Sequence, residues 1–372
     1  MPPLSVLIKP SSSMCNLRCK YCFYHDVSER REIKSFGYMN YDVMEELIRK
    51  SLNFADLYCT FAFQGGEPTL SGLQFYKDFC AVADRYNRKN IDIHYSIQTN
   101  GMLIDDNWAN FFKEHNFLVG LSLDGYKDIN DSLRIRPDGK GTFNQIMKTV
   151  SIFKKYKVDY NILCVVTGYV ARHIRKIYSF FKECDFRYLQ FIPCISPLET
   201  DEEEGFFLSS KRYEYFLNTL FDDWYNDFVK GNYVSIQHID NNILALNGQP
   251  PLLCALTGKC SCQFVIEADG GVYPCDFYVT DQWCLGNITD LTMSFKEFRE
   301  SDKGQKFLSV NDNPVNECTG CKWFFICRGG CRRYREPVKG NTMSQNKFCE
   351  AYKSYYTYTF ERMLQVAKIV RR

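Results

Sequence analysis

The alternation of short apolar runs with amphipathic stretches over residues 4–195 most constrains the fold. Six runs rich in β-branched and aromatic residues predict strands at 4–8, 57–63, 91–97, 118–123, 160–166 and 187–192. Helical patterns lie between them, at 41–52, 72–87, 105–115, 142–157 and 173–184. Asn40 and Asp105 are predicted to be the N-caps of the first and third of these helices. This order predicts parallel strands joined by right-handed crossovers, as an open doubly wound sheet or a partial barrel. In either case, ligands are expected at the carboxyl ends of the strands.

The alternation stops after Cys194, which indicates a second kind of structure. One long helical pattern spans 211–229, and from about residue 238 glycine, cysteine and very short strands dominate. That region has too few apolar runs for an ordinary core, so we expect metal centres to stabilise it. We predict an α/β domain with a connecting helix over 1–237, a small cysteine-rich domain over 238–349, and a C-terminal helix over 350–372.

Charge and composition exclude several classes of function. The 46 basic and 44 acidic residues leave a net charge of +2, which indicates no nucleic-acid or acidic-membrane partner. The amino terminus lacks a signal-peptide pattern, and no run of about 18 apolar residues is present, so we expect a cytoplasmic protein. In that compartment the 18 cysteines point to metal or redox chemistry rather than to disulfides.

Three cysteines, Cys15, Cys19 and Cys22, follow the first predicted strand directly. A structural zinc site normally needs four ligands, and His25 is the one nearby candidate for a fourth. Three thiolates on a four-iron cluster would instead leave one iron open to a small molecule. Zinc, surface thiols and an open cluster are the alternatives that this spacing leaves.

Further motifs follow the next predicted strands. FQGGEPTL (63–70), QTNG (98–101) and SLDG (122–125) end the second, third and fourth strands, and Arg134 follows the last of them. Each motif alone is typical of a turn. Their repetition at successive strand ends indicates a shared site, where glycine permits close approach of the backbone and a guanidinium suits a carboxylate.

The Cys-x3-Cys-x2-Cys spacing and the GGEP element resemble those of the radical S-adenosylmethionine (SAM) enzymes. The resemblance implies a partial (β/α)6 TIM-like barrel and a [4Fe-4S] cluster on Cys15, Cys19 and Cys22 whose open iron chelates SAM. It also implies a set of SAM-binding residues, namely Tyr21, Gly65, Gly66, Glu67, Gln98, Thr99, Asn100, Ser122 and Arg134.

The carboxy-terminal cysteines resemble those of the SPASM domain, found in radical SAM enzymes that modify peptides and proteins. The resemblance implies two auxiliary [4Fe-4S] clusters, three clusters in all. One set of implied ligands is Cys254, Cys260, Cys275 and Cys331, and the other is Cys318, Cys321, Cys327 and Cys349. Cys262 competes with Cys260 for the first set. A pair of zinc knuckles is the rival interpretation of these cysteines.

The stretches CNL.CKYCFYH, FAFQGGEPTL, CDFYV and CKWF..C.GGCRR extend the resemblance over the whole chain, to the anaerobic sulfatase-maturating enzymes. These oxidise a cysteine or serine to Cα-formylglycine within a Cys/Ser-x-Pro/Ala-x-Arg motif of a sulfatase. The resemblance implies Asp276 as the general base, Tyr24 and Gln64 near the substrate, and an external low-potential electron donor such as a flavodoxin or ferredoxin. A solvated loop carboxylate is the alternative for Asp276, and ordinary packing the alternative for Tyr24 and Gln64.

Three other functions stay open at this point. A SPASM peptide maturase of different chemistry, such as thioether formation, would share the cluster cysteines. A non-catalytic iron–sulfur electron carrier would not need the strand-end motifs, and a zinc-bound interaction module would contain no iron. The sequence does not distinguish a cysteine-type from a serine-type substrate.

Overall fold

The computed structural model describes residues 3–198, 206–310, 315–336 and 343–370. The chain divides into two compact units, each built from segments far apart in the sequence. The first unit contains the chain up to Ser122 together with Arg134–Tyr160 and Ser261–Phe307. The second contains Leu123–Leu133, Asn161–Cys260 and the chain from Leu308 onward.

A mixed sheet forms the centre of the first unit. Its strands follow the order β10-β9-β8-β1-β2-β3-β4. Strands β1 to β4 are parallel to their neighbours, whereas β9 is antiparallel to both β8 and β10. The bounds are β1 Leu4–Ile8, β2 Tyr58–Phe63, β3 Asp92–Thr99, β4 Leu118–Ser122, β8 Val265–Ile266, β9 Gly271–Tyr273 and β10 Gly286–Asn287.

Strand β8 lies beside β1 although the two are far apart in the sequence. It pairs in parallel, with Leu7 opposite Val265 and Ile8 opposite Ile266. The segment that we expected within a separate cysteine-rich domain therefore completes the sheet beside the first strand. The predicted domain bounds 1–237, 238–349 and 350–372 stay a prediction.

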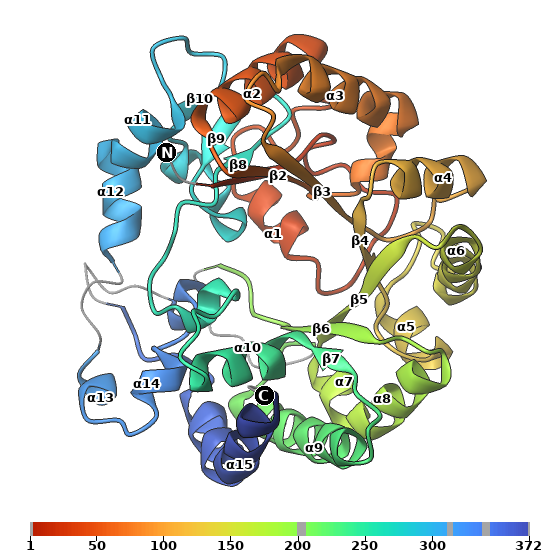
Figure 1. Ribbon diagram of the computed structural model, residues 1–372, viewed down its shortest axis with the longest axis vertical. Coiled ribbons are helices and arrows are strands. Elements are labelled where there is room, and N and C mark those ends of the chain that lie inside the picture. Colours follow the sequence, from red (N-terminus) through yellow and green to blue (C-terminus); the bar gives the residue numbers. More distant parts are fainter. Residues whose placement is uncertain (1–2, 199–205, 311–314, 337–342, 371–372) are drawn as a thin grey trace. The chain divides into compact units, whose positions relative to one another are not determined.

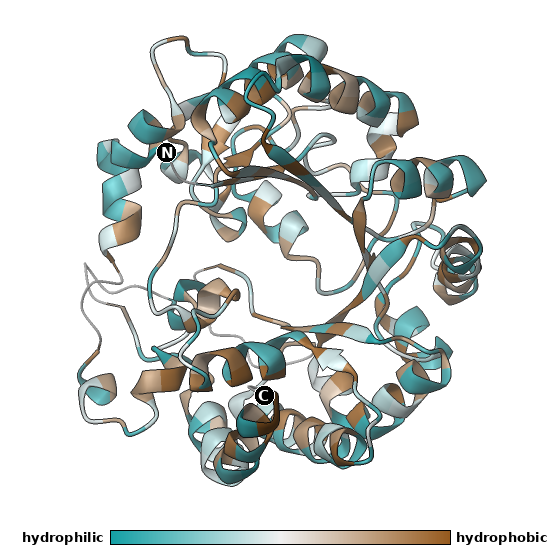
Figure 2. Cartoon of the chain, viewed as in Figure 1, coloured by the Kyte–Doolittle hydropathy of each residue, from teal (hydrophilic) through white to brown (hydrophobic). Residues whose placement is uncertain are grey.

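The helices of the first unit cover the sheet through apolar faces. Phe61 and Phe63 of β2 pack edge-on against Phe79 of α3, and α2 and α3 show both hydrophobic and hydrophilic residues (Figure 2). The predicted N-caps are confirmed, because Asn40 accepts from Val43 N and Asp105 from Trp108 N. The bounds are α1 Phe23–Glu29, α2 Tyr41–Phe54, α3 Gly72–Tyr86, α4 Asp106–Glu114, α6 Phe143–Tyr156 and α11 Phe295–Glu300.

Helix α1 occupies the opposite side of this sheet from the covering helices. Figure 1 shows α2 and α3 beyond strands β2 and β3, whereas α1 lies on the other side of those strands. This helix begins directly after Cys22, which is its N-cap residue. The loop that carries the three cysteines is therefore placed at the carboxyl end of β1, as parallel α/β architecture predicts.

The second unit combines the parallel strands β5-β6-β7 with a largely helical region. Helices α9 and α15 pack against each other, and Tyr213 of α9 contacts the ring of Tyr352 of α15. The strand bounds are β5 Asp159–Val166, β6 Tyr188–Pro193 and β7 Ser235–Ile236. The helix bounds are α5 Lys127–Leu133, α7 Gly168–Arg172, α8 Ile174–Glu183, α9 Ser210–Val229, α10 Gln237–Leu246, α13 Asn316–Thr319, α14 Phe324–Cys327 and α15 Cys349–Val370. Helix α12, Asp302–Ser309, extends across the boundary between the two sets of residues.

All six predicted strands occur within one or two residues of their predicted bounds. Across the residues that the structure describes, no helix is both long and apolar enough to span a bilayer.

Candidate active site

The first three cysteines share one loop and one electrostatic environment. Burial raises the pKa of Cys15 to about 12, and the nearby charges of Glu67, Cys19 and Cys22 act in the same direction. The hydrogen bond from Leu17 N acts in the opposite direction and lowers this pKa. Cys19 and Cys22 therefore lie near enough to Cys15 to influence its titration, and their role as ligands of one cluster stays a prediction. Asn100, which follows β3, contacts this loop: its Nδ2 lies 3.9 Å from Cys15 Sγ and 2.8 Å from Asn16 Oδ1.

The two glycines of GGEP are required by the cysteine loop itself. Gly66 N donates to Ser12 O at 3.0 Å, and Glu67 N donates to Met14 O at 2.7 Å. A Cβ on Gly66 would lie 2.1 Å from Met14 O, and Gly65 has a φ of +120°. The glycines therefore allow two segments of backbone to pack closely, whereas their close approach to a ligand stays a prediction.

Glu67 is the centre of a buried polar network. It is 1% exposed, and burial raises the pKa of its carboxyl group. Its Oε1 accepts from the Thr99 hydroxyl at 2.7 Å and its Oε2 from Asn100 N at 2.8 Å. The network fixes the ends of β2 and β3 beside the cysteine loop, as their assignment to one site requires.

The remaining residues of the predicted SAM-binding set lie at other strand ends of the first unit. Arg134 donates to the Tyr21 hydroxyl at 2.8 Å, which ties the segment after β4 to the cysteine loop. Ser122 is half-buried at the end of β4. Gln98 is exposed on the face of β3 opposite Thr99, because successive strand residues alternate. Its side chain is therefore not part of the Glu67 network.

Tyr24 and Asp276 form a direct pair. The Tyr24 hydroxyl donates to Asp276 Oδ2 at 2.7 Å, and Asp276 Oδ1 is buried without a hydrogen-bond partner. Burial raises the pKa of Asp276, while Lys9 and the Tyr24 hydroxyl act to lower it. A buried carboxylate oxygen without a partner is costly, so this oxygen is available to a bound ligand. Gln64 lies half-buried directly after β2.

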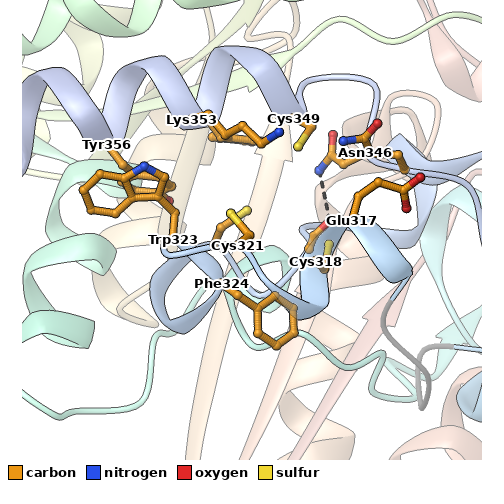
Figure 3. Close-up of a pocket in the computed structure, with 13 residues that line it drawn as sticks. Glu317, Cys318, Cys321, Trp323, Phe324, Asn346, Cys349, Lys353 and Tyr356 are labelled. Carbon is orange, nitrogen blue, oxygen red and sulfur yellow. Dashed lines mark hydrogen bonds between the residues drawn. The ribbon is translucent and has the colours of Figure 1, made fainter.

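Four cysteines of the second unit line one pocket, namely Cys318, Cys321, Cys327 and Cys349. Figure 3 shows Cys349 at the start of α15 across the pocket from Cys318 and Cys321, with the Lys353 side chain directed into the same space. The other walls combine aromatic with polar residues, namely Trp323, Phe324, Tyr352 and Tyr356 with Glu317, Gln345, Asn346 and Lys353. Burial raises the pKa of Cys327 to about 11, and the charges of the neighbouring cysteines add to this effect.

A second group of thiols gathers around Cys331. Burial raises its pKa to about 12, and the nearby charges of Cys254 and Cys260 contribute. Cys275 and Cys262 belong to the other compact unit. The membership of Cys275, and the competition between Cys260 and Cys262, therefore stay predictions.

The donor sets fit clusters better than single ions. Within the described ranges, no three His, Cys, Asp or Glu side chains converge closely enough to hold one metal ion. A single Zn²⁺ would draw its sulfurs to about 2.3 Å. In the Cys318 pocket the thiols instead surround a volume, which suits a cluster whose thiolates bind different irons.

Comparison with known proteins identifies the family. The Radical SAM superfamily model matches residues 10–181 and the model of the SPASM iron–sulfur cluster-binding domain matches residues 258–322. The chain is 48% identical to a cysteine-type anaerobic sulfatase-maturating enzyme of Clostridium perfringens, over 100% of both chains. The chain belongs to the anaerobic sulfatase-maturating enzymes. It is a radical SAM oxidoreductase, and the predicted barrel, SPASM domain and C-terminal helix are confirmed.

Two more distant or structural matches refine this result. A serine-type anaerobic sulfatase-maturating enzyme of Bacteroides thetaiotaomicron is 30% identical, over 95% of this chain and 89% of its own. The solved structure of native anSMEcpe with bound AdoMet and Cp18Cys peptide matches with a TM-score of 0.95 at 47% identity. That match covers 99% of this chain and 100% of the solved one. The family assignment excludes the zinc module and the non-catalytic electron carrier.

Sequence reasoning missed one buried group in the first unit. Lys9, Arg31 and Glu267 form an ion triad whose side chains are at most 2% exposed. The one sequence signal was a lysine directly after an apolar strand, in LSVLIKP.

Proposed function

We propose that this chain oxidises a cysteine of a sulfatase to Cα-formylglycine, with Asp276 as the proton acceptor. The observation that carries the proposal is the Tyr24–Asp276 pair, which leaves Asp276 Oδ1 buried and without a partner. A carboxylate held in this way is pre-organised to accept a proton from a substrate thiol. The sulfatase as substrate class follows from the family.

The choice of cysteine is supported by the pattern of relatives. The chain is 48% identical to the cysteine-type enzyme and 30% identical to the serine-type enzyme. The solved structure at a TM-score of 0.95 was determined with bound AdoMet and Cp18Cys peptide. We therefore propose AdoMet as the cofactor and a Cys-x-Pro/Ala-x-Arg segment as the substrate.

When bound, SAM and the clusters would supply the 5′-deoxyadenosyl radical that removes hydrogen from the substrate Cβ, and the acceptor for the remaining electron. Asp276 takes the thiol proton, so that loss of one hydrogen atom, one proton and one electron leaves a thioaldehyde. Water then releases hydrogen sulfide and leaves the aldehyde. The Tyr24 hydroxyl donates to Oδ2 and so holds the carboxylate in place, which leaves Oδ1 as the oxygen that would take the proton.

The ligand assignments are part of the proposal. Cys15, Cys19 and Cys22 would hold the SAM-binding cluster, and the pocket of Cys318, Cys321, Cys327 and Cys349 would hold one auxiliary cluster. Cys254, Cys260, Cys275 and Cys331 would hold the other. The residues proposed to contact SAM are Tyr21, Gly65, Gly66, Glu67, Gln98, Thr99, Asn100, Ser122 and Arg134, and those proposed to contact the peptide are Tyr24 and Gln64.

The partner and compartment complete the proposal. A low-potential donor such as a flavodoxin or ferredoxin would reduce the first cluster, and the reaction would take place in the cytoplasm. We propose neither a nucleic acid nor a membrane as a partner.

The test is Asp276→Asn in the reconstituted enzyme, with SAM, dithionite and a Cys-containing sulfatase-motif peptide. We expect 5′-deoxyadenosine to form and formylglycine to fall by about 10²–10⁴-fold, the usual contribution of a general base. Mass spectrometry of the peptide measures the aldehyde. Unchanged formylglycine would remove Asp276 as the base.

The same experiment distinguishes formylglycine formation from the remaining alternative, a SPASM peptide maturase of other chemistry. A thioether product retains sulfur in the peptide, whereas formylglycine formation replaces sulfur by oxygen. The mass of the wild-type product therefore decides between the two activities.

A further inference from the structure

A buried ion triad joins the cysteine loop to the segment that carries Asp276. Glu267 Oε1 lies 2.6 Å from Arg31 Nη1 and 3.0 Å from Lys9 Nζ. Its Oε2 accepts from Ala268 N at 3.0 Å. Burial alone would raise the pKa of Glu267, but Lys9 and Arg31 outweigh it and lower the pKa to about 2. Glu267 is therefore present as a carboxylate.

The two cations lie on either side of the cysteine loop. Lys9 follows β1 directly and precedes Cys15, whereas Arg31 follows α1, which begins after Cys22. One carboxylate oxygen thus holds both ends of the segment that contains the three cysteines and Tyr24. Glu267 itself follows β8, nine residues before Asp276 in the chain.

Lys9 also contacts both loops that face the site. A Cβ on Gly65 would lie 3.2 Å from Lys9 Cβ and Cε, so the lysine stem packs under the GGEP backbone. Its ammonium group lies 5.3 Å from the centre of the Tyr24 ring, within the range of a cation–π contact. The lysine is therefore packed between GGEP, Tyr24 and Glu267.

Stability alone does not account for such a triad. Taking three charges out of water costs free energy that their attraction only partly returns, and apolar replacements of buried ion pairs are often neutral or stabilising. Charges in fixed geometry do set the relative position of the segments that carry them.

We propose that Glu267 and Lys9 are positioning residues for the oxidation: they fix Tyr24 and Asp276 relative to the three-cysteine loop, so that radical formation and substrate oxidation stay coupled. This inference rests on the proposed function. Neither side chain contacts the reacting atoms. Their effect is on the geometry between the radical source and the proton acceptor.

The experiment uses Glu267→Gln and Lys9→Met in the reconstituted full-length enzyme. The measured quantity is the ratio of 5′-deoxyadenosine to formylglycine, with a peptide deuterated at the cysteine Cβ. Because a misplacement of about 1 Å can cost 10²-fold, we expect the ratio to rise by about tenfold or more in both variants. Deuterium transfer into 5′-deoxyadenosine should fall, while iron content and the electron paramagnetic resonance signal of the SAM-bound reduced cluster stay unchanged.

Lys50→Met is the matched control. Lys50 is 8% exposed in α2 and donates to Met293 O at 2.8 Å. Its buried ammonium group therefore also joins the amino-terminal segment to the 261–307 segment, through the carbonyl oxygens of Asp290 and Met293. We expect this variant to lose stability and to keep the wild-type ratio.

Several outcomes would overturn the proposal. These are an unchanged ratio in both variants, ratios that move in opposite directions, a parallel loss of both products together with iron, or the failure of both variants to fold. If Glu267→Gln alone fails to fold, Lys9→Met decides. A wild-type enzyme that yields no formylglycine would instead refute the proposed function, and the inference with it.

Discussion

The cysteine loop of the first unit and the four-cysteine pocket of the second differ in what surrounds their thiols. The loop is supported by polar groups, in particular the buried carboxylate of Glu67 and the amide of Asn100. The pocket is walled in part by aromatic rings and carries a fourth cysteine, Cys349, on a separate helix. Polar surroundings and three ligands suit a site that exchanges a polar molecule. Four ligands, with aromatic rings among the walls, suit a closed site that transfers electrons.

The largest expected difference between the two regions is the response to cysteine removal. Replacing Cys15, Cys19 and Cys22 together by Ala should abolish 5′-deoxyadenosine formation, because no iron would remain to hold SAM. Iron should remain at the auxiliary sites. Iron analysis and chromatography of the nucleoside products measure both effects.

The matched control replaces Cys318, Cys321 and Cys327 by Ala. This variant should keep 5′-deoxyadenosine formation and lose formylglycine. Loss of all iron in either variant would contradict the independence of the two regions.

A smaller effect is expected from one methyl group in each region. In Gly66→Ala the new Cβ would meet Met14 O at 2.1 Å, so the cysteine loop must move. We expect a cost of about 1–3 kcal/mol, as for overpacking, and a marked loss of SAM cleavage. Thermal denaturation and 5′-deoxyadenosine formation measure the two.

Gly320→Ala is the corresponding change beside the pocket cysteines. Gly320 has a φ of −103°, and a Cβ there would meet nothing within 4 Å. Stability should change by less than about 0.5 kcal/mol. An equal loss in both variants would show that the glycine contacts do not distinguish the two regions.

The smallest effect on SAM cleavage is expected from a change in the support of the pocket. Asn346 is 6% exposed, donates to Gly329 O at 3.1 Å and accepts from Phe348 N at 2.8 Å. Asn346→Ala should lower the free energy of unfolding by about 1–3 kcal/mol, because two buried groups lose their partner. Iron bound in the pocket should become easier to remove with a chelator, while SAM cleavage stays unchanged. The exposed Asn110, changed to Ala, provides the control.

The sequence predicts the main strands and helices well because their periodicity is local. The first strand, 4–8, was predicted with its observed bounds, and Asn40 and Asp105 cap the helices as expected. The cysteine loop and GGEP could be assigned to one site because parallel strands place their ends together. The residues of that site could thus be predicted from the order of the motifs along the chain.

Contacts between distant segments were not accessible in this way. Strand β8 has two residues and no period to detect. Tyr24 and Asp276 were each selected by resemblance, but nothing local indicates that one hydroxyl donates to the other. In the sequence, Lys9 and Glu267 resemble ordinary charged surface residues, because each lies more than two hundred residues from its partner.

The pairing of β1 with β8 also determines how late during synthesis the sheet can be completed. Leu7 and Ile8 leave the ribosome early, whereas Val265 and Ile266 follow only after most of the chain. At a translation rate of about 5–20 residues per second, β8 is synthesised on the order of ten seconds or more after β1. During that interval this side of β1 is an open strand edge able to pair with another chain. Shortened forms of the protein that end before β8 would keep that edge open permanently.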